Sequence, residues 1–257
     1  MLNIIQLATW LHRRWYFVVS SALLSLVSAA GAPLPGGGQA GLTAATLKLF
    51  GDFPSFTSKS DVRLQEKPGR TTTTLTMDFG MLDGKVRMEL DMGSVRSAQI
   101  PAQTLASLKA AGLTKVVTVL LPERRQALVI YPGAGSYAEI PMAPDEAADM
   151  HKKFRIEKNR VGKETVGGYA CEKTKVVLRS DTGEKHEALV WYAADLNDFP
   201  VRIQIDQSDA TVVMDFREVK LARLDSKQFE APAGFVRYDN AEALMQNAML
   251  KAISSGK

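Results

Sequence analysis

The chain has 257 residues, of which 46% are hydrophobic and 23% charged, so it is long enough to bury a core without disulfide bonds. Its single cysteine, Cys171, excludes an internal disulfide and a zinc site built from cysteines. The formal charge of +4 falls to +2 if Arg13 and Arg14 leave with an N-terminal signal, so the charge gives no case for nucleic-acid binding.

The first 32 residues have the three parts of a secretory signal peptide. A basic patch at residues 12–14 precedes an apolar run from Trp15 to Val27, and small residues end the segment at Ala30 and Ala32. This run has thirteen residues, whereas a membrane-spanning helix needs about 20. We therefore predict a signal peptide over residues 1–32, cleaved after Ala30 or Ala32, and a periplasmic or secreted protein with no stable membrane span after cleavage. A retained N-terminal anchor is the alternative.

Residues 33–55 are predicted to form a flexible leader followed by a short helix. Two prolines and the run Gly36–Gly38 prevent regular structure over residues 33–41. Thr43 is placed to cap a helix that ends at Gly51. The folded domain is then expected to cover residues 56–257.

The domain opens with segments in which apolar and polar residues alternate, as in a strand with one buried face. Residues 58–66 are a first such segment, and residues 70–79 and 86–92 form the clearest predicted hairpin of the chain, with Gly84 before its second strand. The apolar positions of that hairpin include Leu75, Met77, Phe79, Met88, Leu90 and Met92.

Two further segments, residues 115–121 and 126–131, are almost continuously apolar, so both of their faces should be covered. In total the patterns predict about eleven strands and three or four short helices, a mainly β (α+β) protein. The other predicted strands cover residues 136–140, 154–158, 169–178, 187–192, 201–205 and 210–221, and the later helices cover 101–113, 144–153 and a last segment capped by Asn240.

Three segments carry a family resemblance: GKETVGGYACEK, VWYAADLNDFPVRIQ and FEAPAGFVRYDN, with YAEIPM upstream. They resemble a family of bacterial envelope proteins of the domain of unknown function 4412 type, which itself resembles the LolA, LolB and LppX carriers of lipoproteins and lipids. The resemblance covers roughly Phe56 to Leu250. It implies a curved, unclosed antiparallel β-barrel, with short helices covering the concave side over an apolar cavity.

No catalytic motif is present in the sequence. The segment Gly133–Ser136 lacks the spacing of a nucleophile elbow, and Asp195 and Asp198 are best interpreted as a turn rather than a cation site. Cys171 is expected to be a small buried side chain, as free cysteines usually are, and a poor nucleophile, because no histidine lies near it in sequence to act as a base. We therefore expect no cofactor, no metal and no enzymatic activity, with a hydrolase or transferase as a remote alternative.

The methionines are the most suggestive feature, because flexible thioethers suit a cavity that accepts acyl chains of variable shape. The leading hypothesis is a non-enzymatic carrier or binder of an apolar ligand, such as a lipid, an acyl chain or a lipoprotein, with a possible envelope protein partner. The alternative is a structural or partner-binding envelope protein whose own side chains fill the core. The candidate cavity residues are Leu75, Met77, Phe79, Met88, Leu90, Met92, Trp191, Met214, Phe216, Leu244, Met245 and Met249.

Overall fold

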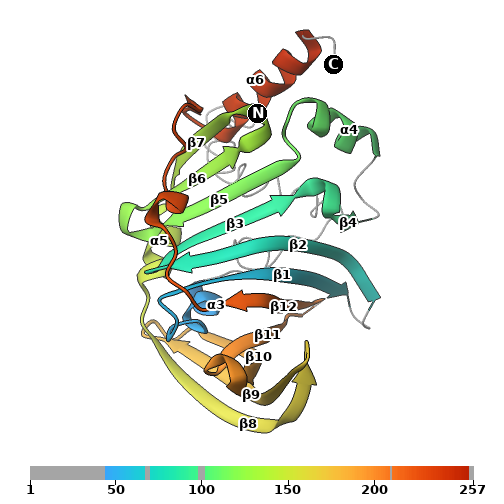
Figure 1. The fold of residues 1–257 in the computed structure, drawn as a ribbon. Coiled ribbons are helices and arrows are strands. Elements are labelled where there is room, and N and C mark those ends of the chain that lie inside the picture. The colour runs from blue at the N-terminus through green and yellow to red at the C-terminus, as the bar shows by residue number, and fades with distance from the viewer. Residues whose placement is uncertain (1–43, 67–69, 98–101, 209, 255–257) are drawn as a thin grey trace, which may run out of the picture.

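A computed structural model gives the fold, which is dominated by one large and strongly curved β-sheet (Figure 1). The predicted signal peptide, the leader over residues 33–41 and the predicted helix cap Thr43 lie outside the described residues. The structure describes residues 44–66, 70–97, 102–208 and 210–254.

Thirteen strands form this sheet, in the spatial order β13-β7-β6-β5-β3-β2-β1-β12-β11-β10-β9-β8, with β4 paired to β2 off the main path. Neighbours are antiparallel except β13 and β7, which are parallel. Strands β13 and β8 are the two ends of this order and do not pair with each other, so the curved sheet is not closed into a barrel. This confirms the predicted mainly β, unclosed architecture. The strands are β1 (Ser55–Glu66), β2 (Arg70–Leu82), β3 (Lys85–Asp91), β4 (Arg96–Ser97), β5 (Lys115–Leu121), β6 (Gln126–Tyr131), β7 (Ser136–Pro141), β8 (Phe154–Val166), β9 (Tyr169–Ser180), β10 (Lys185–Ala193), β11 (Phe199–Asp206), β12 (Ala210–Lys220) and β13 (Val236–Tyr238).

The helices are short, and none within the described ranges is long and apolar enough to cross a membrane. As predicted, Asn240 caps the last of them, its side-chain Oδ1 accepting the N–H of Ala243 at 2.8 Å. Helices α4 and α6 lie together at the upper end of the sheet in Figure 1. The α-helices are α3 (Ala44–Lys48), α4 (Ala102–Ala110), α5 (Pro144–His151) and α6 (Ala241–Ser254), and the 3-10 helices are η2 (Met92–Ser94), η3 (Pro122–Arg124), η4 (Pro132–Ala134), η5 (Ala194–Leu196) and η6 (Ser226–Phe229).

The inner face of the sheet carries the main core. Side chains alternate along β1, so Phe56 and Val62 are buried on the inner face while Lys59 and Asp61 lie on the outer face. Phe50, just after α3, packs in the middle of four phenylalanines from four strands, at ring-centroid distances of 5.2 to 5.9 Å. These four are Phe56 of β1, Phe79 of β2, Phe199 of β11 and Phe216 of β12.

A second, smaller core covers the outer face of β5 and β6. Phe229 of η6 packs there with Val119 of β5 and with Leu128 and Ile130 of β6, all at most 3% exposed. The expectation that both faces of these two strands are covered is therefore confirmed. It follows that the segment after β12 returns across the outer face before β13 joins the sheet edge.

Candidate ligand-binding site

One transverse row of side chains crosses the inner face over seven strands. Strand register places each member directly opposite the next, so the row spans six strand spacings, about 29 Å. It begins with a cation and a hydroxyl and is apolar from its third member onward. From β8 to β2 the row consists of Arg160, Thr174, Val190, Ile203, Met214, Val62 and Leu75.

The sequence-predicted cavity residues all belong to the main hydrophobic cluster or pack against it. Met245 and Met249, on α6, are half-buried, whereas the other ten are at most 8% exposed. Met92, which the alternation placed on a strand, instead begins η2 and is buried there. The structure thus gathers these residues from both halves of the chain. On the inner face lie Leu75, Met77, Phe79, Met88, Leu90, Met214 and Phe216.

Trp191 shares the cluster but lies on the outer face. Its register partners are Lys173 of β9 and Arg202 of β11, whose cationic groups lie 4.8 and 5.5 Å from the centre of its ring system. Its Nε1–H donates to Oε2 of Glu164 at 2.8 Å. Trp191 is therefore placed away from the inner row, to which its neighbour Val190 belongs.

Methionines are concentrated in this core. The chain contains ten, and every one after Met1 is buried in the main cluster or packed against it. Four of them, Met77, Met81, Met88 and Met214, lie on the inner face of β2, β3 and β12. Unbranched thioether side chains adapt to irregular space, so this face can change its packing with little strain.

Buried hydroxyls on the inner face were missed by the sequence analysis. The side-chain oxygens of Ser58, Ser60, Thr174 and Tyr192 find no hydrogen-bond partner among the described residues, and each residue is at most 7% exposed. Burial, with smaller contributions from the carboxylates of Asp52 and Asp198, raises the pKa of Tyr192 to about 12. For the two serines and the threonine, the sequence signal was a small polar residue inside an apolar alternation, whereas Tyr192 was visible only as one of two adjacent aromatic residues.

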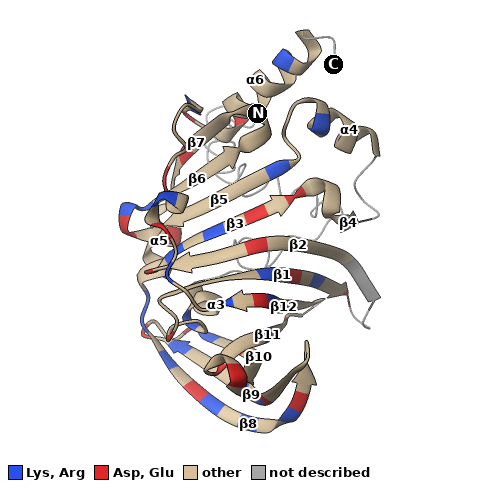
Figure 2. Ribbon diagram, in the orientation of Figure 1, with Lys and Arg blue, Asp and Glu red and all other residues tan. Residues whose placement is uncertain are grey.

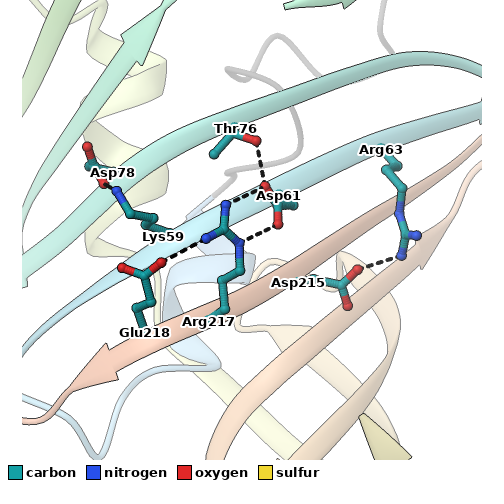
Figure 3. A network of polar contacts seen from close by, with 8 residues as sticks. All are labelled: Lys59, Asp61, Arg63, Thr76, Asp78, Asp215, Arg217 and Glu218. Atoms are coloured by element: carbon teal, nitrogen blue, oxygen red, sulfur yellow. Dashed lines mark hydrogen bonds and ion pairs between the residues drawn. The ribbon is translucent and has the colours of Figure 1, made fainter. Parts of the chain in front are cut away.

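The outer face carries an extended polar network (Figure 3). Asp61 accepts hydrogen bonds from Arg217 at 2.7 Å and Thr76 at 2.5 Å, and the bond from Arg217 is the main reason that the pKa of Asp61 is lowered. Asp215 joins Arg63 and Arg202, each at 2.5 Å. These pairs neutralise one another, which is typical of a structural surface.

A groove of about 370 Å³ lies beside this network, under the segment that follows β12. Gly80 forms part of its lining, and most of its charged groups are paired: Lys59 with Asp78 at 3.0 Å, Arg87 with Glu89 at 2.9 Å, and Glu218 with Arg217 at 2.9 Å. Because these paired charges neutralise each other, the groove does not indicate a particular ligand.

No feature of the described chain indicates catalysis. Cys171 is buried as expected, its Sγ lies 3.3 Å from the carbonyl oxygen of Tyr169, and burial raises the pKa of its thiol. Within the ranges that the structure describes, no three His, Cys, Asp or Glu residues gather as they would around a metal ion. The inner face is the better candidate for a functional site.

Comparisons with known proteins agree with the family resemblance in the sequence. The family described as Domain of unknown function (DUF4412) matches residues 68–199, which is 132 of the 257 residues. No curated protein matches the chain.

Several solved structures have a similar fold, at low scores. The chain is 10% identical to lipoprotein LppX from Mycobacterium tuberculosis, with 71% of this chain and 96% of that chain covered and a TM-score of 0.37. It is 12% identical to a LolA superfamily protein from Nitrosomonas europaea (74% and 98% covered, TM-score 0.35) and to LprF from Mycobacterium bovis (74% and 98% covered, TM-score 0.38).

Proposed function

This chain belongs to the DUF4412 family of domains of unknown function, and we propose that it is a periplasmic, non-enzymatic carrier or binder of an apolar ligand, such as a lipid, an acyl chain or a lipoprotein. The ligand would lie on the inner face of the curved sheet, beneath the short helices. The candidate cavity residues of the sequence analysis that lie on or over this face, Trp191 excepted, would contact it.

The observation that carries this proposal is the collection of nine methionines in or against the main core, four of them on the inner face of the sheet. Each methylene of a ligand buried there would contribute about 0.8 kcal/mol, so a long acyl chain would bind without a specific polar motif. The adaptable thioethers would then repack around chains of different shape. Such a site explains why the sequence contains no recognisable catalytic or cofactor motif.

A second candidate function is favoured by the phenylalanine cluster around Phe50. These five rings fill the inner face under α3, as they would in an envelope protein with a structural or partner-binding role and a core completed by its own side chains. The two functions differ in one measurable property, because only the carrier takes up an apolar molecule while staying folded.

The half-buried methionines of α6 allow this property to be tested without disrupting the deepest core. The double variant Met245→Gln, Met249→Gln keeps good helix-forming residues but makes the face of α6 toward the sheet polar. We expect it to bind a fluorescent fatty acid more weakly than the wild-type protein, by about tenfold, with a similar melting temperature.

The matched control is Gln246→Met, which adds a thioether to the exposed side of the same helix and should leave binding unchanged. Wild-type protein that binds no fluorescent fatty acid would support the filled-core alternative. If the control loses as much affinity for the fatty acid as the double variant, the effect of α6 on binding comes from general changes to the helix and not from contact with the ligand.

The proposed periplasmic location depends on the predicted signal peptide, residues 1–32. N-terminal sequencing of protein purified from an envelope fraction should give a chain that starts at Gly31 or Pro33. A chain that still starts at Met1 would instead support the retained anchor.

A further inference from the structure

Edge strand β8 carries three cations that face the inner side of the sheet. Lys158, Arg160 and Lys163 are opposite Val176, Thr174 and Glu172 of β9, respectively, and Val176 and Thr174 are inner-face residues of the core. We call these three cations the inner lip. Figure 2 shows basic residues along β8, at the edge of the curved sheet. All three are exposed, so the inner side of this strand is open.

The inner lip has an excess of positive charge. Glu172 is its acidic neighbour, and it pairs with Arg160, Nε to Oε1, at 2.8 Å. Lys158 lies over the ring of Tyr192, with Nζ 4.5 Å from the centroid, and Lys163 forms no ion pair with any described residue. These three cations and their one acidic register partner, Glu172, leave a net charge of +2. The carboxylates of Asp52 and Asp198 act on Tyr192, beside Lys158, so the excess positive charge lies toward Arg160 and Lys163, where it would attract an anion.

A buried hydroxyl without a partner lies directly beside these charges. Thr174 is 2% exposed, its Oγ1 has no hydrogen-bond partner in the described part of the chain, and its register partner on β8 is Arg160. Leaving such a group unsatisfied destabilises a fold, because the desolvated hydroxyl gains no hydrogen bond in return. An incoming acceptor oxygen would remove this penalty.

Two carboxylates help to place the anion within this region. Asp52 and Asp198 act on the hydroxyl of Tyr192, whose pKa they help to raise, so that end of the region disfavours negative charge. At the Arg160–Thr174 end, the acidic register partner in the described sheet is Glu172, which already binds Arg160. An anion is therefore best accommodated between Arg160 and Thr174.

The same two residues begin the transverse row, which is apolar from Val190 to Leu75. A ligand aligned with this row needs an anionic end and a long apolar part. We propose that the inner lip and Thr174 bind the anionic head group, a carboxylate or a phosphate, of an amphiphile whose acyl chain lies along the apolar part of the row. This inference rests on the proposed carrier function and names the class of its ligand.

The first test compares ligands that differ only in head-group charge. Palmitic acid and its methyl ester each compete with Nile red, an uncharged dye, for the full-length protein. We expect palmitic acid to bind at least about tenfold more tightly than the ester. Equal affinities would overturn the head-group site but leave the carrier function intact. If the protein binds neither Nile red nor palmitic acid, the carrier function itself is contradicted.

The second test neutralises the inner lip. The triple variant Lys158→Gln, Arg160→Gln, Lys163→Gln should lose about tenfold in affinity for palmitic acid and less than about twofold for the ester. The matched control neutralises three cations on the outer side of β8 and β9, with the substitutions Arg155→Gln, Lys175→Gln and Arg179→Gln. This control should keep the preference for palmitic acid over the ester. An equal effect in both variants would reduce the site to general electrostatic attraction and overturn the proposal.

The third test separates stability from binding at Thr174. Thr174→Val has nearly the same shape and removes the unpartnered hydroxyl, so it should fold at least as stably as the wild type while binding palmitic acid more weakly. Unchanged palmitic acid affinity would contradict a role for this hydroxyl. Glu172→Gln should have the opposite effect on affinity, because it frees Arg160.

The last arm distinguishes an amphiphile from a free anion. Inorganic phosphate added at millimolar concentration should not displace palmitic acid, because phosphate has no acyl chain to bury. Displacement by phosphate alone would identify a simple anion site and overturn the amphiphile assignment.

Discussion

The indole N–H of Trp191 on β10 donates to Glu164 on β8 at 2.8 Å, although β9 lies between these two strands. Lys173 of β9 completes the contact, with its Nζ 3.4 Å from the same carboxylate and 4.8 Å from the centre of the indole ring system. This contact fastens edge strand β8 to the sheet from its outer side. The three cations on the inner side of β8, Lys158, Arg160 and Lys163, take no part in this contact.

Replacing Trp191 with Phe should loosen this edge. The variant keeps an aromatic ring but removes the donor, so Glu164 loses the hydrogen bond that is the largest cause of its lowered pKa. We expect faster hydrogen exchange at the amides of β8, with β1 unaffected as the internal control. Unchanged exchange in β8 would mean that backbone pairing with β9 alone fixes this strand.

The pH dependence of this contact has a definite sign. Because the pKa of Glu164 is lowered in the folded protein, its stabilising effect is present above the ordinary carboxyl pKa and is lost as the pH falls through the lowered value. The difference in melting temperature between wild type and Trp191→Phe should therefore shrink in acid. A difference that stays constant from neutral pH to strong acid would contradict this account.

The outer face depends on Asp215, which bridges Arg63 of β1 and Arg202 of β11. Its side chain is 22% exposed, so the substitution Asp215→Asn leaves two guanidinium groups close together without a carboxylate between them. We expect a loss of about 1–3 kcal/mol in the free energy of unfolding, measured by urea titration. Glu66→Gln, at the exposed end of β1, should change it by less than about 0.5 kcal/mol.

Gly112 is required by a close backbone approach. It has φ +70°, and a Cβ atom at this position would lie 2.4 Å from the carbonyl oxygen of Gly133. Gly112→Ala should lower the free energy of unfolding by about 2–4 kcal/mol, because strain and overlap both contribute. Gly84, at φ +80° in open space, is the matched control, and Gly84→Ala should cost only about 1–2 kcal/mol. Equal losses in urea titration would contradict the close approach.

The substitution Phe50→Ala tests whether the segment around α3 is part of the folded domain. The ring is fully buried among four other phenylalanines, so Phe50→Ala should destabilise the protein by about 3–5 kcal/mol in denaturant unfolding. Ile253→Ala, at a side chain that is 76% exposed on α6, should have almost no effect. Similar stability of the two variants would mean that the segment around α3 packs differently from the arrangement described.

The pattern of apolar residues, alternating in some strands and continuous in others, made most of the fold predictable. The strands over residues 115–121 and 126–131 were predicted with the bounds that the structure has, because their apolar runs end at clear turns. The two strands that were missed, β4 and β13, have two and three residues, too few to show a period. Strand β8 runs to Val166 rather than residue 158, because an edge exposed on both sides has no buried alternation to recognise.

The site was less predictable, because it depends on which face each side chain takes. Trp191 and Tyr192 are adjacent aromatic residues, and the sequence does not tell which of them points inward. The unpartnered hydroxyl of Thr174 was also invisible, because it depends on register with β8 and β10. Register between distant strands comes from turn geometry and packing together.

The most direct test of the carrier function is mass spectrometry of organic extracts from the mature protein, residues 33–257, purified without detergent from an envelope fraction. The account predicts a stoichiometric amphiphile with an acyl chain and an acidic head group. Repeated absence of any lipid, together with no uptake of a fluorescent fatty acid, would contradict the carrier function and support a core filled by its own side chains.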